Sequence, residues 1–197
     1  MRAERGLSLW RRLKEEESGG VAVEAGFYFV IFFLLCALLT DMSAVFLDKG
    51  RLERVNLSLA TITQQRARFY RGEETLSASE VRQLYDLAGV LFKESRLAGR
   101  AYAVYTDAVY FSPGDQRASE KTLSYQAGES GCDVRKYTMT SKEVTDLAVW
   151  NPDDARWLPI YQVTICVVGT QSLFKRLGGA LGMAVGDLSV SNAVLPR

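Results

Sequence analysis

The stretch of residues 18–47 reads SGGVAVEAGFYFVIFFLLCALLTDMSAVFL and contains the longest apolar segment of this 197-residue chain. Its centre, residues 25–39, runs for fifteen residues without a charge, a length that also suits a signal-peptide core or a buried helix. Apolar residues continue to Leu47, and a helix over residues 25–47 would be about 35 Å long, at about 1.5 Å per residue. Since the hydrocarbon core of a bilayer is about 30 Å thick, the sequence predicts a transmembrane helix, which we assign to residues 20–47.

Basic residues on both sides of this helix predict its orientation. Five precede the apolar segment and three follow it closely, and cytoplasmic flanks carry the excess of Lys and Arg. Residues 1–19 are therefore expected to form a cytoplasmic leader at the inner membrane, and residues 48–197 a domain on the periplasmic side. The preceding basic residues are Arg2, Arg5, Arg11, Arg12 and Lys14, and the following ones are Lys49, Arg51 and Arg54.

The entrance to the apolar segment carries a glycine pair, Gly19 and Gly20, and a single glutamate, Glu24. Cleavage after Gly19 would make Gly20 the first residue and Glu24 the fifth. This spacing resembles the processing site of type IV pilin-like proteins, in which the glutamate pairs with the new N-terminal amine of a neighbouring subunit. The resemblance implies a register-setting role for Glu24. The alternatives are a cleaved signal peptide, or an uncleaved anchor in which Glu24 lies at the lipid–water boundary, favoured by the helix N-terminus.

The helix is predicted to continue beyond the membrane. Apolar residues recur at steps of three, four, three and seven, which is typical of one face of an amphipathic helix. This face is expected to pack on the sheet of the distal domain, and the alternative is packing on a neighbouring subunit. Gly50 marks a point where the helix can loosen or kink. The apolar positions are Leu52, Val55, Leu59, Ile62 and Phe69.

The rest of the chain predicts an α+β domain. Ser77 and Glu80 have the spacing of a capping box, which opens a second amphipathic helix. Helices followed mainly by consecutive strands suggest an antiparallel sheet. Residues 116–131 are expected to form a loop or an edge hairpin, and residues 151–154 a turn. The expected strands are 102–105, 108–111, 158–168 and 187–195, with a short helix over 172–181.

Three cysteines bear on the compartment. Cys132 lies in the polar stretch and Cys166 in the strongest predicted strand, while Cys36 lies in the apolar segment. In an oxidising compartment Cys132 and Cys166 are expected to pair, and the alternative is two reduced cysteines of which one is buried. Cys36 is expected to be inert packing within the bilayer.

The sequence offers little for catalysis or for binding of cofactors, metals or nucleic acid. The chain has no histidine, the commonest general base and metal ligand, and its net charge of +1 does not suggest a nucleic-acid partner. Ser172 and Lys175 have the Ser-x-x-Lys spacing of penicillin-interacting enzymes, but companion motifs are lacking. We therefore expect no enzyme activity, no catalytic, cofactor-binding or metal-binding residues, and no cofactor.

Over nearly its full length the chain resembles the TadE/TadF pseudopilins of the tight-adherence (Flp) pilus system, and the TadF type in particular. The segments that carry the resemblance are the Gly19–Glu24 entrance, the single span, GRLERVNLSLATITQQRARFY (50–70), LPIYQVTIC (158–166) and the ending LSVSNAVLPR. Ala25 stands where many relatives carry an aromatic residue.

This resemblance implies a non-catalytic minor pseudopilin that is cut by a prepilin peptidase and acts in assembling a pilus used for adhesion and biofilm formation. The implied partners are the peptidase, a TadE-type pseudopilin, other pilus-machinery subunits and the membrane. A different class remains open at this point: a permanently anchored single-pass adaptor or sensor domain that binds an envelope ligand.

Overall fold

The structure of the chain is a computed structural model that describes residues 17–70, 72–112, 117–129, 132, 139–169, 172–180 and 187–196. The chain divides into two compact units, Met1–Ala44 and Val45–Arg197. Most of the expected leader, residues 1–16, lies outside the described residues.

The first described element is the 48-residue helix α2, Glu17–Gln64. Its apolar part is long and apolar enough to cross a membrane, with a mean hydropathy of 2.4, and none of that part is buried within the chain. Large apolar side chains are exposed around it, an arrangement that is costly in water and favourable in lipid. The helix runs through Gly50 without a break.

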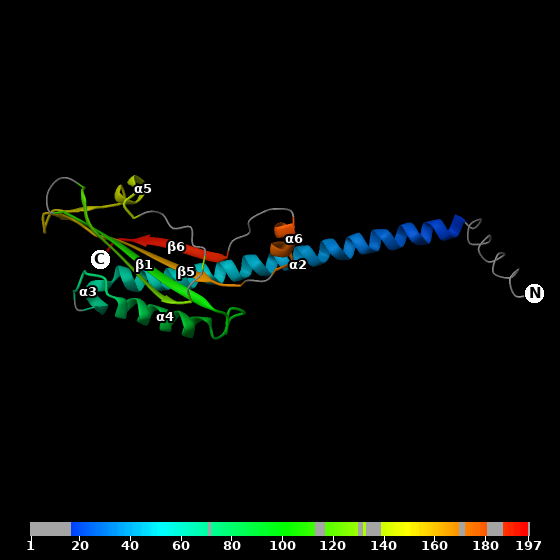
Figure 1. Cartoon of the computed structure of the whole chain (residues 1–197), viewed down its shortest axis with the longest axis horizontal. Helices are drawn as coiled ribbons and strands as arrows, with labels where there is room; N and C mark the ends of the chain where they lie inside the picture. Colours follow the sequence, from blue (N-terminus) through cyan, green and yellow to red (C-terminus); the bar gives the residue numbers. More distant parts are fainter. Residues whose placement is uncertain are drawn as a thin grey trace, which may run out of the picture. The chain divides into compact units, whose positions relative to one another are not determined.

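The second unit is built on a four-stranded antiparallel sheet of order β2-β1-β5-β6 (Figure 1). A two-stranded hairpin, β3 and β4, forms a separate small sheet around the expected turn at 151–154. This architecture confirms the predicted α+β class. The strands are β1 (Tyr102–Phe111), β2 (Ser119–Gly128), β3 (Trp150–Asn151), β4 (Arg156–Trp157), β5 (Ile160–Val167) and β6 (Leu188–Val194), and the shorter helices are α3 (Arg66–Phe69), α4 (Ala78–Phe92), α5 (Lys142–Thr145) and α6 (Leu173–Ala180).

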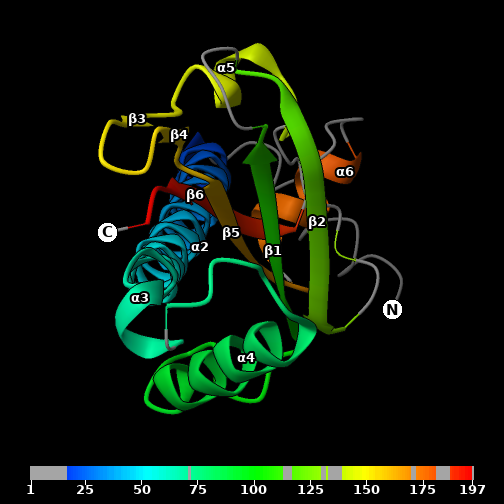
Figure 2. The same ribbon diagram turned by 90° about the vertical axis from the view of Figure 1, so that its left-hand side faces the viewer.

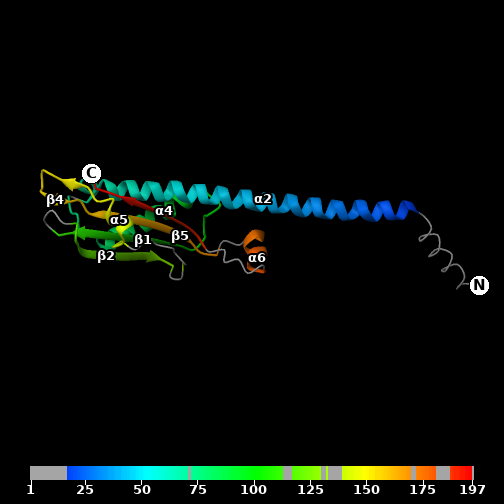
Figure 3. The ribbon, with the colours of Figure 1, turned by 90° about the horizontal axis from the view of Figure 1, so that it is seen from above.

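The strand predictions are confirmed at β5 and β6 and refined elsewhere. All eight residues of β5 are buried, as expected of a central strand rich in β-branched residues. The two short strands predicted at 102–105 and 108–111 are one continuous strand, β1. The polar stretch 116–131 contains the edge strand β2, which lies at the side of the sheet away from α2 in Figure 3.

Helices α2 and α4 cover one face of the sheet (Figure 2). Leu52, Val55 and Leu59 of α2 share a core cluster with residues of α4 and with Val104 and Ile165 of the sheet, which confirms that this face of α2 packs on the domain's own sheet.

Phe69 was wrongly placed on this face, since 56% of its surface is exposed. Helix α2 ends at Gln64, and a turn at Gln65 precedes α3, so the helical phase is reset before Phe69. The residue that does point inward at this end is Arg66, which is 1% exposed.

Arg66 connects α3 to three other parts of the domain. Its guanidinium pairs with the buried carboxylate of Glu80 at 2.9 Å and donates to the carbonyl of Thr75 at 3.1 Å. It also lies over the ring of Tyr161 on β5, 5.0 Å from the ring centroid. Glu80 additionally accepts from the backbone N–H of Ser77 in the capping box that begins α4, as predicted.

Because both charges are buried, breaking this pair from one side leaves an uncompensated charge. We predict that Arg66→Met lowers the free energy of unfolding by about 3–5 kcal/mol. The matched control is Arg68→Met, since Arg68 lies exposed on the same short helix and its loss is expected to cost less than about 0.5 kcal/mol. Urea unfolding of the full chain in detergent, followed by tryptophan fluorescence, measures both. A double change, Arg66→Met with Glu80→Leu, should recover much of the lost stability. If Arg66→Met and Arg68→Met lowered the free energy of unfolding equally, that result would contradict the role of the pair.

Candidate processing and assembly site

The predicted processing residues lie in the first turns of α2. Gly19 and Gly20 are helical, and a side chain added at Gly20 would meet no atom within 4 Å. Glu24 follows one helical turn later and is exposed, and the part of the chain that the structure describes gives its carboxylate no hydrogen-bond or ion-pair partner. Gly20 and the carboxylate of Glu24 are therefore accessible to another molecule.

The hydroxyl groups farther along this helix, by contrast, are satisfied locally. Thr40 donates to the carbonyl of Cys36 and Ser43 donates to the carbonyl of Leu39, both at 2.8 Å. Such bonds to the preceding turn let hydroxyl groups enter a membrane at low cost. Glu24 differs from them because a carboxylate in lipid requires a partner, and α2 supplies none.

The structure joins Cys132 to Cys166 by a disulfide with a Cα–Cα distance of 6.3 Å. Cys166 is fully buried on β5, opposite Ala103 of β1 and Ser189 of β6, on the face of the sheet away from α2 and α4. Cys36 is free and exposed on α2. The disulfide holds Cys132 against this face.

The described residues contain one group with possible metal ligands, Cys132, Cys166 and Asp187, whose ligand atoms lie within 4.8 Å of one another. The disulfide occupies both sulfurs, and a zinc site would need them as thiolates. The group therefore does not suit a metal ion. Ser172 stands one residue before α6 begins, so it does not share the helix with Lys175 as the sequence suggested.

A cavity of about 440 Å³ opens at the end of the domain near the β3–β4 hairpin, and sequence reasoning did not find it. Arg156 and Glu74 both line this cavity, and the Arg156 guanidinium pairs with both carboxylate oxygens of Glu74. Its hydrogen bonds to Glu74 raise the pKa of Arg156. Arg66 and Trp150 also line the cavity. No sequence motif predicted this cavity, because Glu74 and Arg156 are 82 residues apart in the sequence.

Among the described residues, a single apolar helix that begins with a glycine pair and a glutamate is followed by an α+β domain that packs on the end of the same helix, and this arrangement fits a pilin-like membrane protein. The family model of TadF, described as "Putative tight adherence pilin protein F", matches residues 12–196. The chain belongs to the TadF family and is a component of a tight-adherence pilus. Comparison with curated proteins and with solved structures finds no match. Membership in a pilin family fits a structural role rather than an enzymatic one.

The disulfide is expected to stabilise the domain by closing a loop of 34 residues. We predict that Cys132→Ser lowers the free energy of unfolding by roughly 4 kcal/mol in the chain-entropy account. Cys36→Ser is the matched control, because it removes a free cysteine and leaves the disulfide intact. Unfolding with and without a reductant, together with mobility on a non-reducing gel, measures both variants. Equal stability and mobility for Cys132→Ser and the unchanged chain would contradict the pairing.

Proposed function

We propose that the chain is a minor pseudopilin that is made as a precursor and cut between Gly19 and Gly20 by a prepilin peptidase. The observation that carries this proposal is the exposed carboxylate of Glu24, to which the described residues give no partner. It lies one turn after Gly20, at the start of the only candidate span among the described residues. A peptidase at the membrane surface needs a backbone that it can straighten, and glycine has the least restricted backbone.

In this proposal residues 1–19 are a cytoplasmic leader, residues 20–47 span the inner membrane, and residues 48–197 form the periplasmic domain. The excess of basic residues before the span supports this orientation. The disulfide supports it independently, because disulfides form and persist in the periplasm and are rare in the cytoplasm.

After cleavage, the amine of Gly20 and the carboxylate of Glu24 lie at the same end of the helix. The amine of one subunit can then pair with the carboxylate of another, most naturally a TadE-type pseudopilin or another subunit of the pilus machinery. Such a pair offsets the cost of both charges in lipid only when two helices stand at one relative height. Glu24 would thus set the register of assembly, and no chemical step is assigned to it.

Processing predicts a specific new N-terminus. In cells that contain the peptidase, Gly19→Ala should accumulate as the precursor, whereas the natural chain should lose about 2 kDa and begin at Gly20. Gly26→Ala is the matched control, since Gly26 is an exposed glycine of the same helix and lies beyond the cleavage site. Gel mobility and N-terminal sequencing measure the outcome. An intact Met1 in the natural chain would instead favour a permanently anchored adaptor or sensor domain.

Register setting predicts that Glu24→Ala impairs assembly more than processing. Glu24→Gln keeps the size of the side chain and removes only its charge, so it should reproduce the assembly defect if the ion pair is what matters. The fraction of cleaved chain and the amount of surface pilus, measured in the same cells, separate the two effects. Normal piliation in Glu24→Ala would exclude the register role.

A further inference from the structure

Two segments far apart in the sequence meet at one end of the domain. They are residues 45–54 of α2 and the turn 93–101 between α4 and β1, and Arg51 lies with its Nη2 3.5 Å from the carbonyl oxygen of Glu94. Helix α6 belongs to the same end (Figure 1), because it lies between β5 and β6 in the chain. The last residue of β5, Val167, pairs with Tyr102 at the start of β1 and with Leu188 at the start of β6.

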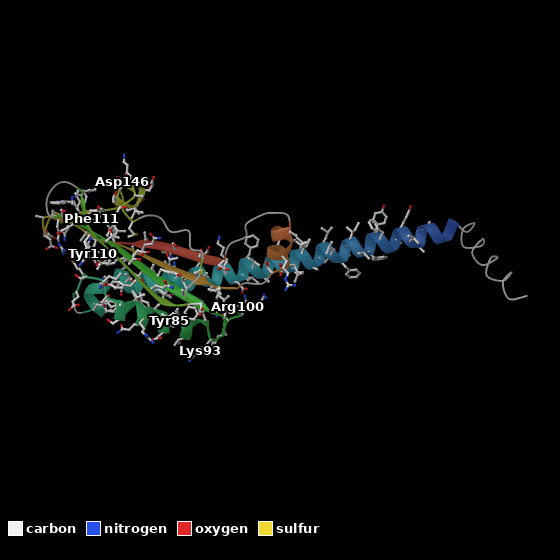
Figure 4. All side chains as sticks on the ribbon, in the orientation of Figure 1. Tyr85, Lys93, Arg100, Tyr110, Phe111 and Asp146 are labelled. Carbon is white, nitrogen blue, oxygen red and sulfur yellow. A yellow bond between two sulfur atoms is a disulfide. The ribbon has the colours of Figure 1, made fainter. Side chains whose placement is uncertain are left out.

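This end of the domain is basic. The two segments carry six cations against three carboxylates, a net charge of +3 in a chain whose total is +1. Figure 4 shows Lys93 and Arg100 at this end, away from Tyr110 and Phe111. The cations are Lys49, Arg51, Arg54, Lys93, Arg96 and Arg100, and the carboxylates are Asp48, Glu53 and Glu94.

Most of this charge is not neutralised within the domain. The one ion pair recorded between described residues of the two segments joins Lys49 to Glu53 at 4.0 Å, and both side chains are about half exposed, so it is weak. Neither Arg54 nor Arg96 makes an ion pair with any residue that the structure describes. These two guanidinium groups are free to bind an anion from outside.

A cavity of about 350 Å³ lies between the two segments. Arg51, Arg54 and Arg96 line it, so guanidinium groups reach it from both segments. Phe46 and Leu47 line the same cavity and are 65% and 70% exposed. A ligand that fits this lining combines an anionic group with an apolar part.

The turn that presents Lys93, Arg96 and Arg100 is held in place by its own contacts. Leu97 is 1% exposed and inserts into the core cluster between the helices and the sheet. The hydroxyl of Ser95 donates to the carbonyl of Phe92 at 2.8 Å and accepts from the N–H of Leu97 at 3.2 Å. Binding an anion here therefore costs little backbone ordering.

The position of this end relative to a bilayer rests on the proposed span of residues 20–47. If the span ends at Leu47, Arg51 lies about 6 Å and Arg54 about 10 Å farther along the helix. The headgroup layer on one side of a bilayer is roughly 5–8 Å thick, and an arginine side chain can extend back toward it. The arginines would then stand beside the lipid phosphates, with Phe46 and Leu47 at the level where the acyl chains begin.

We infer that this end of the domain is a docking surface for anionic phospholipids, with a headgroup phosphate in the cavity between Arg51, Arg54 and Arg96. The exposed side chains of Leu173 and Leu177 on α6 add apolar contact with the membrane interface. An acidic protein partner could bind the arginines, but its charge alone would not account for the exposed Phe46 and Leu47 beside them. Binding to the membrane holds the domain on the bilayer through its lipid contacts as well as through the span.

The test uses the full, uncleaved chain in nanodiscs of phosphatidylcholine with or without phosphatidylglycerol. Hydrogen–deuterium exchange of residues 93–101 reports whether the turn is held at the headgroups. Phosphatidylglycerol is expected to slow this exchange, and added salt should reverse the effect. The variant Arg54→Gln with Arg96→Gln should weaken docking roughly 25-fold, about fivefold for each cation near an anionic leaflet.

The matched control is Arg82→Gln with Lys121→Gln, which removes the same charge from exposed positions on α4 and β2. It should exchange like the unchanged chain. The inference is overturned if phosphatidylglycerol has no effect on the unchanged chain, if the two double variants behave alike, or if inorganic phosphate in solution slows exchange as well as the lipid does. Because the test uses the uncleaved chain, a failure of processing in cells would not change its outcome. If the chain failed to insert into nanodiscs, the transmembrane span that both the proposed function and this inference require would be wrong.

Discussion

The packing of residues 52–63 of α2 against the sheet is the interaction on which the rest of the domain depends. Leu52, Val55 and Leu59 supply one side of the main core cluster, and Asn56 donates from Nδ2 to the carbonyl of Val163 at 3.2 Å. Without this part of α2, the inner residues of β5 would be open to water. The same helix carries the apolar segment at its other end. One continuous helix therefore has an exposed apolar part suited to lipid and a part that packs in the core of the domain.

The end of this helix is fixed by charge rather than by apolar packing. Arg66 follows Leu59 and Ile62 at spacings of three and then four residues. In the sequence, this spacing predicts an apolar residue at position 66. A cation is tolerated there because Glu80 neutralises it and the rings of Tyr70 and Tyr161 face it, at 5.1 and 5.0 Å from its guanidinium carbon. Burial raises the pKa of Tyr161, whose hydroxyl stays neutral and donates to the carbonyl of Glu74. The pair thereby connects α3, the start of α4 and the sheet.

The sequence was sufficient to predict helices and strands where capping motifs and residue preferences agree with the burial that the structure shows. The capping box at Ser77 and Glu80 marks the start of α4, and the β-branched run of β5 predicts a strand, which the structure buries on both faces. Strand β2 was harder, because only alternate residues such as Leu123 and Tyr125 face the helices while their neighbours are polar and exposed. The Glu74–Arg156 pair and the basic end of the domain depend on tertiary packing, which brings distant residues together and which no local pattern encodes.

The distribution of cations gives the proposed cleavage an electrostatic consequence. In the proposed topology, the leader would bring five basic residues and four glutamates to the cytoplasmic leaflet, and its basic residues outnumber the three that follow the span closely. Cleavage after Gly19 would remove these five cations and four carboxylates and leave one new amine, so the remaining basic residues would lie on the periplasmic side. The leader's polar contacts at the cytoplasmic surface would then be lost, and the basic end of the domain and the partner of Glu24 would become the main polar constraints on the helix. Cleavage would thus convert a helix held from the cytoplasmic side into one whose release depends on replacing its periplasmic lipid contacts with contacts to another subunit.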